Sequence, residues 1–444
     1  MIFLVFILFS PPTMYTAKLG PVIGTISNNH IRVLLECEFT LSSKPIQLTI
    51  SAGGNTEALQ FPYVNGSMIL RLELLHPTET HVITFDNVMS DNQLAVCSFN
   101  PLVSSVAIIS CDGDGVYHYA TGNKAKAWNL ANNTKISHAL HIGDQVYIDD
   151  AYDTGVRRIA DTGLDAAFVF DAEIRKIYYQ SWFQCREKRI FLANHINMMI
   201  IDDHDIYDNF TSAKFRENVY PRKYMEVFIN VAAKIAGEYQ IGLSQDVPIT
   251  KYSDLINIAK VSFLEGEDMK FMIVNSRLTK TDKWMFDDAT KQIIRENIQT
   301  EKKLIFVDQV SPFIVSHNYT QFKTLFKLGG IDITDHITYS ASWINDYNWL
   351  FYILSQSNAR EIVYATGDLH VGQNHTLIGQ YRNIQCLTSS PMSSNVAMKP
   401  DSLMRFVADF VSQKYERFSY TNNFICYNNF VVISNKLNKT IVVF

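Results

Sequence analysis

The sequence of 444 residues contains little cysteine and none of the motifs that use it. Its six cysteines lie far apart, and no two of them form a Cys-X-X-Cys pair. This absence argues against a zinc ribbon and against a thioredoxin-like redox motif. Cys37 and Cys97 could meet inside a small β domain, and the sequence leaves their pairing and the redox compartment open.

An excess of basic residues is also absent. The formal net charge is −5 at pH 7, so no nucleic-acid-binding surface is evident. Hydrophobic residues make up 47% of the chain and charged residues 19%, which is typical of a folded globular protein. A chain of this length is expected to form roughly two or three domains.

Long hydrophobic runs are missing as well. Residues 1–9 are apolar and end at Ser10-Pro11-Pro12, which is too short for a membrane-spanning helix. The run lacks the basic start of a signal peptide. Residues 1–19 are therefore interpreted as an apolar leader or tail. A functional signal would place the protein outside the cell or in the endomembrane system, and otherwise we expect it in the cytoplasm.

Residues 20–100 contain short apolar segments separated by turn residues, a pattern typical of an antiparallel β-sandwich domain. After Pro101, strand-like runs alternate with helical patterns, which predicts a large α/β domain over residues 101–444. The clearest expected strands are 106–110, 139–142, 196–201, 270–275, 304–307 and 361–366. The expected helices are 171–193, 343–357 and 402–415, and residues 423–444 return to strands.

Residue types that bind metals follow several of these strands directly. Because ligands bind outside the carboxyl ends of strands in α/β sheets, we expect these side chains to converge at one edge. So many carboxylates repel one another unless cations neutralise them, which predicts two or more metal ions. The predicted ligands are Cys111, Asp112, Asp144, Tyr147, Asp203, Asp368 and His370.

Each of these signals alone has a simpler interpretation. One aspartate after a strand usually belongs to a turn or a helix cap, as Asp205 and Asp208 could. Cys111 alone would be a small buried apolar residue. The recurrence of such residues at four strand ends favours the metal site.

Four motifs in this order resemble the PhoD-like (alkaline phosphatase D) branch of the calcineurin-like metallophosphoesterases. They are Ser110-Cys111-Asp112, His141–Tyr147 (HIGDQVY), Ile201–Phe210 (IDDHDIYDNF) and Gly367–Gly372 (GDLHVG). The resemblance is strong at these motifs and coarse over about residues 20–444. It implies an α/β fold, a four-layer α/β/β/α sandwich, with an N-terminal antiparallel β-sandwich domain.

The resemblance also implies roles for these residues. Asp144 would bridge two metals, with Cys111, Tyr147 and His370 on one of them, Fe(III). Asp203 and Asp368 would bind the second, Ca(II) or another divalent ion, and Asp112 stands at a position of variable polar type. His204 would contact the phosphate and the leaving group, and Asp144, Asp203 and His204 form the catalytic set. Thiolate and phenolate are ligands that suit a ferric ion, whereas carboxylates suit calcium.

The implied activity is metal-dependent hydrolysis of phosphomonoesters or phosphodiesters by a hydroxide bound between two metals. The substrate would be a small-molecule, lipid or nucleotide phosphate ester. No Gly-X-Ser-X-Gly elbow occurs, which counts against serine-hydrolase chemistry. The alternative is a catalytically decayed binding protein whose β-sandwich recognises a glycan or a protein. Loss of a metal ligand or of His204 would favour that alternative, and none is lost.

The sequence departs from the family pattern at a few positions. Asn275 stands where the family has an aspartate, and Asp308-Gln309 stands where it has Asn-Gln. Ala341 stands before Ser342-Trp343 where the family often has an aspartate, and these departures leave substrate preference and catalytic efficiency open. The remaining candidates for substrate contact are Arg157, Arg158, Arg277, Tyr207, Asn209 and His375, and each arginine alone is more often a solvated surface residue.

Overall fold

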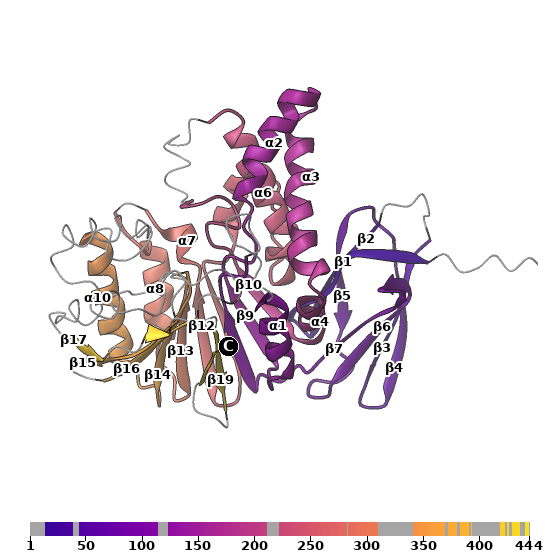
Figure 1. Cartoon of the computed structure of the whole chain (residues 1–444). Helices are drawn as coiled ribbons and strands as arrows, with labels where there is room; N and C mark the ends of the chain where they lie inside the picture. Colours follow the sequence, from indigo (N-terminus) through magenta and orange to yellow (C-terminus); the bar gives the residue numbers. More distant parts are fainter. Residues whose placement is uncertain are drawn as a thin grey trace, which may run out of the picture.

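The structure, a computed structural model, is organised around three β-sheets (Figure 1). It describes residues 14–38, 44–113, 123–210, 222–281, 283–309, 341–368, 372–379, 382–389, 392, 418–421, 424–425, 429–435 and 440–443. The strands near the N-terminus lie beside the rest of the molecule, which holds two central sheets with helices on their outer faces.

The N-terminal strands form a β-sandwich. Side chains alternate along them: Ile46 and Leu48 of β3 are buried, whereas Gln47 between them is exposed. All pairings are antiparallel except that of β1 with β6, through which β1 connects the two layers. Cys37 and Cys97 are both buried in this core as free thiols. The strands are β1 (Tyr15–Ser27), β2 (His30–Cys37), β3 (Ile46–Ala52), β4 (Asn55–Phe61), β5 (Ser67–Glu73), β6 (His81–Ser90) and β7 (Gln93–Phe99).

The first central sheet has the strand order β10-β9-β8-β19-β20 among the described residues. β8, β9 and β10 are parallel, while β19 and β20 are antiparallel to their neighbours. The parallel strands place their carboxyl ends at one edge of the sheet. Its strands are β8 (Ser105–Ile109), β9 (His138–Ile142), β10 (Ile196–Ile200), β19 (Asn429–Ser434) and β20 (Thr440–Val443).

The second central sheet has the order β11-β12-β13-β14-β16-β15-β17 in the described chain, with β18 paired to β15. Its middle strands β12, β13, β14 and β16 are parallel. Its strands are β11 (Val261–Glu265), β12 (Met269–Val274), β13 (Lys303–Asp308), β14 (Ile362–Thr366), β15 (Gly372–Gly379), β16 (Ile384–Thr388), β17 (Phe418–Thr421) and β18 (Phe424–Ile425).

Both central sheets are buried on two faces, which gives four layers. On β8, Val106 and Ile108 face the core between the sheets, whereas Ala107 and Ile109 face the helices outside. The residues of β13 are likewise all buried. They alternate between the core that separates the two sheets and the cluster under the helices outside. The helices α1 (Asn123–Asn133) and α4 (Arg186–Asn194) cover the first sheet, and α8 (Asp288–Asn297) and α10 (Ala341–Ser355) cover the second (Figure 1). This is the expected α/β/β/α sandwich.

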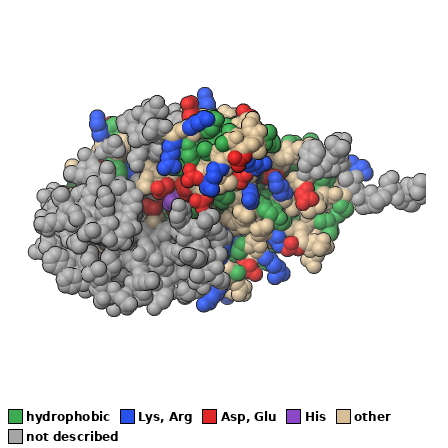
Figure 2. All heavy atoms as spheres, turned by 45° about the horizontal axis from the view of Figure 1, so that its top comes forward, with side chains coloured by type: hydrophobic (Ala, Val, Ile, Leu, Met, Phe, Trp, Pro, Cys, Tyr) green, Lys and Arg blue, Asp and Glu red, His purple; other side chains and the backbone are tan. Residues whose placement is uncertain are grey.

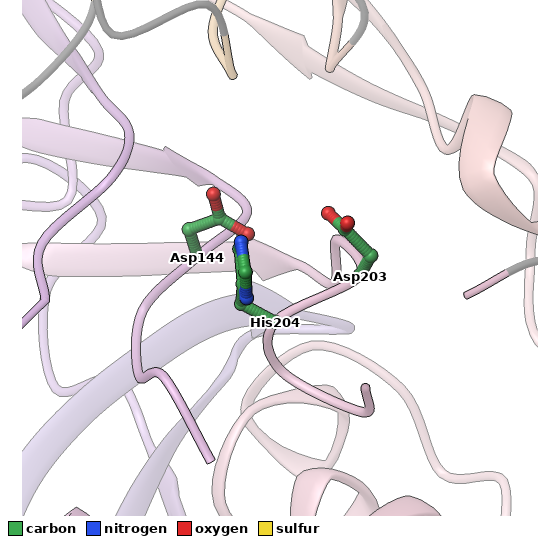
Figure 3. A group of neighbouring side chains, drawn as sticks. All are labelled: Asp144, Asp203 and His204. Atoms are coloured by element: carbon green, nitrogen blue, oxygen red, sulfur yellow. The ribbon is translucent and has the colours of Figure 1, made fainter. Parts of the chain in front are cut away.

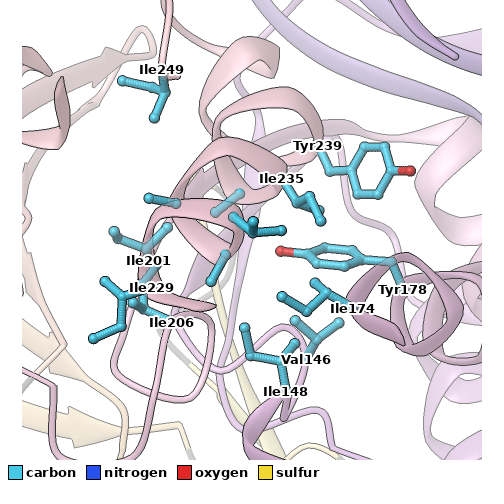
Figure 4. Close-up of a cluster of buried hydrophobic side chains, with 14 of the residues drawn as sticks. Val146, Ile148, Ile174, Tyr178, Ile201, Ile206, Ile229, Ile235, Tyr239 and Ile249 are labelled. Atoms are coloured by element: carbon cyan, nitrogen blue, oxygen red, sulfur yellow. The ribbon is translucent and has the colours of Figure 1, made fainter. Parts of the chain in front are cut away.

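A separate helical layer stands above the carboxyl edge of the first sheet. The helices α2 (Asp149–Thr162), α3 (Ala166–Tyr178) and α6 (Met225–Tyr239) pack around an apolar cluster that continues into the loops after β9 and β10 (Figure 4). Val146 and Ile148 follow β9, and Ile201 and Ile206 follow β10, and all four are buried there. The motif loops are therefore held by apolar packing on either side of their polar residues.

The helix expected over residues 171–193 is interrupted. α3 ends at Tyr178, a π-helical turn covers Tyr179–Gln184, and α4 begins at Arg186. Cys185 has extended backbone angles, so helical hydrogen bonding cannot continue through it. The expected strands each correspond to an observed strand, within a residue or two at the ends. The expected helix 402–415 lies outside the described residues, as do residues 1–13. No helix in the described part of the chain is long and apolar enough to cross a membrane.

Candidate metal centre

Hydrogen bonds join the loops that follow three parallel strands. Asp112 N donates to Asp144 O (2.9 Å), which joins the loop after β8 to the loop after β9. Asp368 N, after β14 of the second sheet, donates to the hydroxyl of Ser110 (3.1 Å). The two sheets therefore meet at this edge, and the convergence expected from the sequence is present.

Three residues of this edge have unusual backbone angles. Cys111, Asp144 and Asp368 have φ values of 57°, 54° and 66°, in the left-handed region. That conformation costs an ordinary L-residue about 1–2 kcal/mol, and such strain is concentrated at functional sites. Each of the three turns the chain sharply at the end of a strand and brings a potential metal ligand to the sheet edge.

Carboxylates gather at the point where these loops meet. Asp144, Asp202, Asp203 and Asp368 each offer an oxygen, and these atoms all lie within 4.8 Å of one another. Asp144, Asp203 and His204 form an overlapping group with the same spacing (Figure 3). Seen from above the sheet edge, Asp and Glu side chains collect in a recess in which a histidine is also visible (Figure 2).

The donor set fits cations. Asp144 Oδ1 and Asp202 Oδ2 are buried and accept no hydrogen bond from any described residue. Burial, together with nearby acidic groups, raises the pKa of both carboxyls well above the ordinary value of 3.8. Buried acceptors without donors are costly, and cations would satisfy them. Cys111 Sγ and the hydroxyl of Tyr147 lie 3.6 and 3.3 Å from Asp144 Oδ2, so a thiol and a phenol adjoin the same carboxylate.

One fully buried arginine partly neutralises this group. Arg277, just after β12, bonds to Asp202 through Nε and to Asp203 Oδ1 through a terminal nitrogen (3.0 Å). Its other terminal nitrogen donates to Phe210 O (3.1 Å). Arg277 thus holds the loop after β10, and neither a solvated surface position nor a free phosphate-binding guanidinium describes it.

His204 is oriented by Asp149 at the start of α2. His204 Nδ1 lies 2.6 Å from Asp149 Oδ2, and the imidazole stacks on the ring of Tyr147 with 4.3 Å between centroids. Burial lowers the pKa of His204, but Asp203, Asp149 and Asp144 raise it by more, so the net pKa shift is well upward. The positive imidazolium is therefore favoured beside the carboxylates.

Asp205 holds backbone groups of the motif loops. Its carboxylate accepts backbone N–H groups of Asp144 (3.0 Å), Gln145 (3.0 Å) and Asp202 (3.0 Å). Asp205 therefore fixes the two motif loops against each other, which is the turn-capping alternative, and Asp149 orients the histidine.

Comparison of the structure with solved structures finds the same architecture. The structure of PhoD matches with a TM-score of 0.64 and 11% identity, over 97% of this chain and 89% of that one. The chain has the fold of the PhoD-like metallophosphoesterases. A purple acid phosphatase from yellow lupin (Lupinus luteus) seeds matches with a TM-score of 0.52 and 12% identity, over 93% and 69% of the two chains. No protein-family model and no curated protein sequence matches the chain.

Within this fold, most of the predicted ligands lie together and one lies apart. Cys111, Asp144, Tyr147 and Asp203 adjoin one another as described, and Asp368 completes the carboxylate group. The structure places Asp112 outside this group. Its carboxylate is buried against Lys188 of α4 and accepts from Trp128 Nε1 of α1 (3.1 Å), so the side chain faces the helices that cover the first sheet. His370 lies outside the described residues.

The departures from the family pattern also have partners of their own. The carboxylate of Asp308 accepts hydroxyls of Tyr347 (3.0 Å) and Tyr364 (3.2 Å), away from the carboxylate group. Asn275 Oδ1 accepts from Gln309 Nε2 (2.9 Å). Asp308 is therefore held beside the two tyrosines under the helices of the second sheet, where burial raises the pKa of its carboxyl to about 6.

Of the other candidates for substrate contact, Arg158 pairs with Glu173 (2.7 Å), and Arg157 bonds to the carbonyl of Asp153 in its own helix (3.3 Å). Tyr207 accepts from Arg222 (3.0 Å), and Asn209 N donates to Asp203 Oδ2 (2.7 Å). The side chain of His375 lies outside the described residues.

The sequence did not assign Asp202 to the site as a potential ligand or Asp149 as the histidine partner, and it named Arg277 for contact with substrate, whereas the structure shows Arg277 clamping Asp202 and Asp203. Asp202 directly precedes Asp203, so its position at a strand end was a usable signal. Asp149 carries no local signal, because its partner His204 is distant in the chain, and the carboxylate partners of Arg277 are equally distant.

Proposed function

We propose that the chain is a metal-dependent phosphoesterase that hydrolyses phosphate monoesters or diesters. The observation that carries the proposal is the group of buried carboxylates with unsatisfied oxygens, beside a thiol, a phenol and an oriented histidine. The fold supports it, since one structural neighbour is a purple acid phosphatase. The same arrangement has no obvious use in a protein that only binds a glycan or a protein.

Two cations fit this donor set. Asp144 would bridge them, since its Oδ2 adjoins Cys111 and Tyr147 while its Oδ1 is unsatisfied. Cys111 and Tyr147, with His370, would hold Fe(III), and Asp203 and Asp368 would hold Ca(II) or a similar ion. When bound, the cations supply Lewis-acid polarisation of the phosphoryl group and lower the pKa of a water molecule.

The protein groups then position the substrate and move a proton. His204 has its Nδ1 engaged by Asp149, which leaves Nε2 to donate to the leaving oxygen. Its raised pKa keeps that proton in place until it is needed. Stacking on Tyr147 fixes the plane of the ring, and the clamp of Arg277 keeps Asp203 at a constant position.

The test measures hydrolysis of p-nitrophenyl phosphate and bis-p-nitrophenyl phosphate with added iron and calcium, and counts bound metal in the same samples. We expect metal-dependent turnover in the natural chain, with loss of both turnover and bound metal in Asp144→Asn. The ratio of the two rates separates monoesterase from diesterase activity.

The matched control is Asp153→Asn, which removes an exposed carboxylate on α2. It should retain activity and metal. A folded chain that neither binds metal nor turns over either substrate would overturn the proposal and favour a catalytically decayed binding protein.

A further inference from the structure

A fully buried lysine joins the two loops that carry Cys111 and Asp144. Lys188, in the first turn of α4, pairs with the carboxylate of Asp112 and donates to Gln145 O (3.3 Å). Asp112 directly follows Cys111, and Gln145 directly follows Asp144. One ammonium group therefore contacts the residue next to each of two predicted metal ligands, on loops that follow two different strands.

The surroundings of Lys188 fix the position of its ammonium. A third acceptor, Ser181 Oγ, lies 3.5 Å from Nζ, so the three protons of the ammonium meet three acceptors. The rings of Trp128 and Trp182 lie on either contact, with centroids 5.3 and 5.4 Å from Nζ. Trp128 Nε1 donates to the carboxylate that pairs with the lysine (3.1 Å), and Trp182 Nε1 donates to Gln145 O (3.4 Å).

Both predicted ligands beside this lysine have strained backbones. Cys111 and Asp144 have φ values of 57° and 54°, and such conformations persist only where the surrounding structure fixes them. The backbones of the two loops are joined directly, by Cys111 N to Gly143 O (3.4 Å) and by Asp112 N to Asp144 O (2.9 Å). Lys188 adds a side-chain connection between the same loops, next to each strained residue.

Stability of the fold alone does not require this ion pair. Taking two charges out of water is costly, and replacing a buried pair by uncharged groups of similar size often leaves stability unchanged or raises it. The helix α4 is already anchored by Phe191 and Leu192, which are both buried in apolar clusters. What the ion pair adds is geometry, because charged hydrogen bonds fix the distance between the groups that they join.

We propose that Lys188 is a positioning residue of the metal centre, whose ammonium holds Cys111 and Asp144 at the separation at which both bind one cation. This inference rests on the proposed metal-dependent function. Its effect is concentrated on the cation beside Cys111, because the described contacts of Lys188 reach neither Asp203 nor Asp368.

The experiment uses the full chain and two probes, Co²⁺ for the thiolate side and Ca²⁺ for the carboxylates. A bond between Co²⁺ and a thiolate gives a charge-transfer band in the near ultraviolet, and Cys111→Ser identifies that band. In Lys188→Met, we expect Co²⁺ affinity to fall about 10- to 100-fold and Ca²⁺ affinity to change less than about threefold. The band should also weaken or shift at saturating Co²⁺, since the sulfur of Cys111 is no longer held in place.

The sign of the effect separates geometry from charge. Loss of one buried positive charge would by itself strengthen the binding of both cations. Weaker Co²⁺ binding with a changed band therefore reports a displaced ligand. The matched control is Lys303→Met, which removes another buried lysine, paired with Glu361 (3.0 Å) at the first residue of β13. It should leave both affinities and the band unchanged.

A double variant avoids an unpaired buried charge. Asp112→Asn combined with Lys188→Met keeps the local net charge, should show the same loss of Co²⁺ affinity, and provides the test if Lys188→Met does not fold. Absence of the thiolate band in the natural chain would overturn the metal centre and, with it, this role. A band in the natural chain, with Co²⁺ affinity unchanged or higher in the variants or with equal losses for Co²⁺ and Ca²⁺, would overturn the role of Lys188 alone.

Discussion

The aspartates between Ile201 and Phe210 carry the same charge but have different partners. Asp202 and Asp203 are held by Arg277, Asp205 accepts four backbone N–H groups, and Asp208 is largely exposed beside His204. Repulsion in this stretch is therefore relieved in part by an arginine and in part by backbone donors. The repulsion that remains lies within the group that Asp202 and Asp203 form with Asp144 and Asp368, where cations would neutralise it.

At this scale, Asp149 is the residue whose removal separates histidine orientation from metal binding. Asp149→Asn weakens the hydrogen bond to His204 Nδ1 and leaves all four aspartates of the carboxylate group in place. We expect kcat/KM for phosphate esters to fall by about 10- to 100-fold with bound metal unchanged. The loss should be smaller for substrates with acidic leaving groups, which need less protonation. Equal loss for all leaving groups, or a loss of metal, would contradict this role.

The raised pKa values of Asp144 and Asp202 predict proton release on metal binding. Carboxyls with raised pKa values retain protons at pH values where free carboxyls have lost them, and cations bind the ionised form. Metal affinity should therefore fall as the pH is lowered. Calorimetric titration of calcium at one pH in two buffers of different ionisation enthalpy should give different heats. Identical heats would mean that both groups are already ionised.

At the scale of elements, the turns after the strands determine the site more than the strands do. The turn after β9 is the tightest case. Gly143 has φ of +100°, and a Cβ added there would lie 2.2 Å from Cβ of Asp202 in the turn after β10. The absence of a side chain allows the two turns to touch, which brings Asp144 and Asp203 within reach of common cations.

Gly143→Ala should consequently separate these turns and weaken metal binding by at least about tenfold, because Asp144 and Asp202 move apart. Gly163→Ala is the matched control: Gly163 also has positive φ, +68°, but an added Cβ would meet nothing within 4 Å. It should cost about 1–2 kcal/mol of stability from backbone strain and leave metal affinity unchanged. Chemical denaturation and metal titration of both variants provide the measurements. Equal metal affinity in the two would show that the contact with Asp202 is unimportant.

At the scale of the whole molecule, the sandwich and the α/β part share contacts that cross the boundary near residue 100. Asn197 of β10 donates through Nδ2 to Ile23 O of β1 (2.9 Å), and Ile196 packs in the sandwich core. Buried Glu36 of β2 accepts from the hydroxyl of Tyr239 in α6. Because apolar and polar contacts both cross the boundary, we expect the two parts to unfold together.

Leu48→Ala tests this coupling, since Leu48 is fully buried in the sandwich and distant from the metal centre. The cavity it leaves should cost about 2–5 kcal/mol. Hydrogen exchange should then show equal loss of protection in β3 and in β14 of the second sheet. Leu94→Ala, at an exposed position of β7, should change stability by less than about 0.5 kcal/mol. Loss confined to β3 would show that the sandwich unfolds independently.

The sequence by itself determined the strands and the edge where the polar residues meet, whereas the four layers were implied by the family resemblance. Strand periodicity is local, and parallel strands must end at one edge, so Cys111, Asp144, Asp203 and Asp368 could be placed together without coordinates. The motif resemblance supplied their order.

The tertiary structure alone decided which charges pair. Arg277 reaches Asp202 across 75 positions, His204 reaches Asp149 across 55, and Lys188 takes Asp112 across 76. Those distances in sequence are bridged by the packing of helices on sheets, which no local pattern encodes. Asp112, predicted as a metal ligand, therefore forms a buried ion pair with Lys188. Arg277, a candidate for substrate contact or for a solvated surface position, instead clamps Asp202 and Asp203.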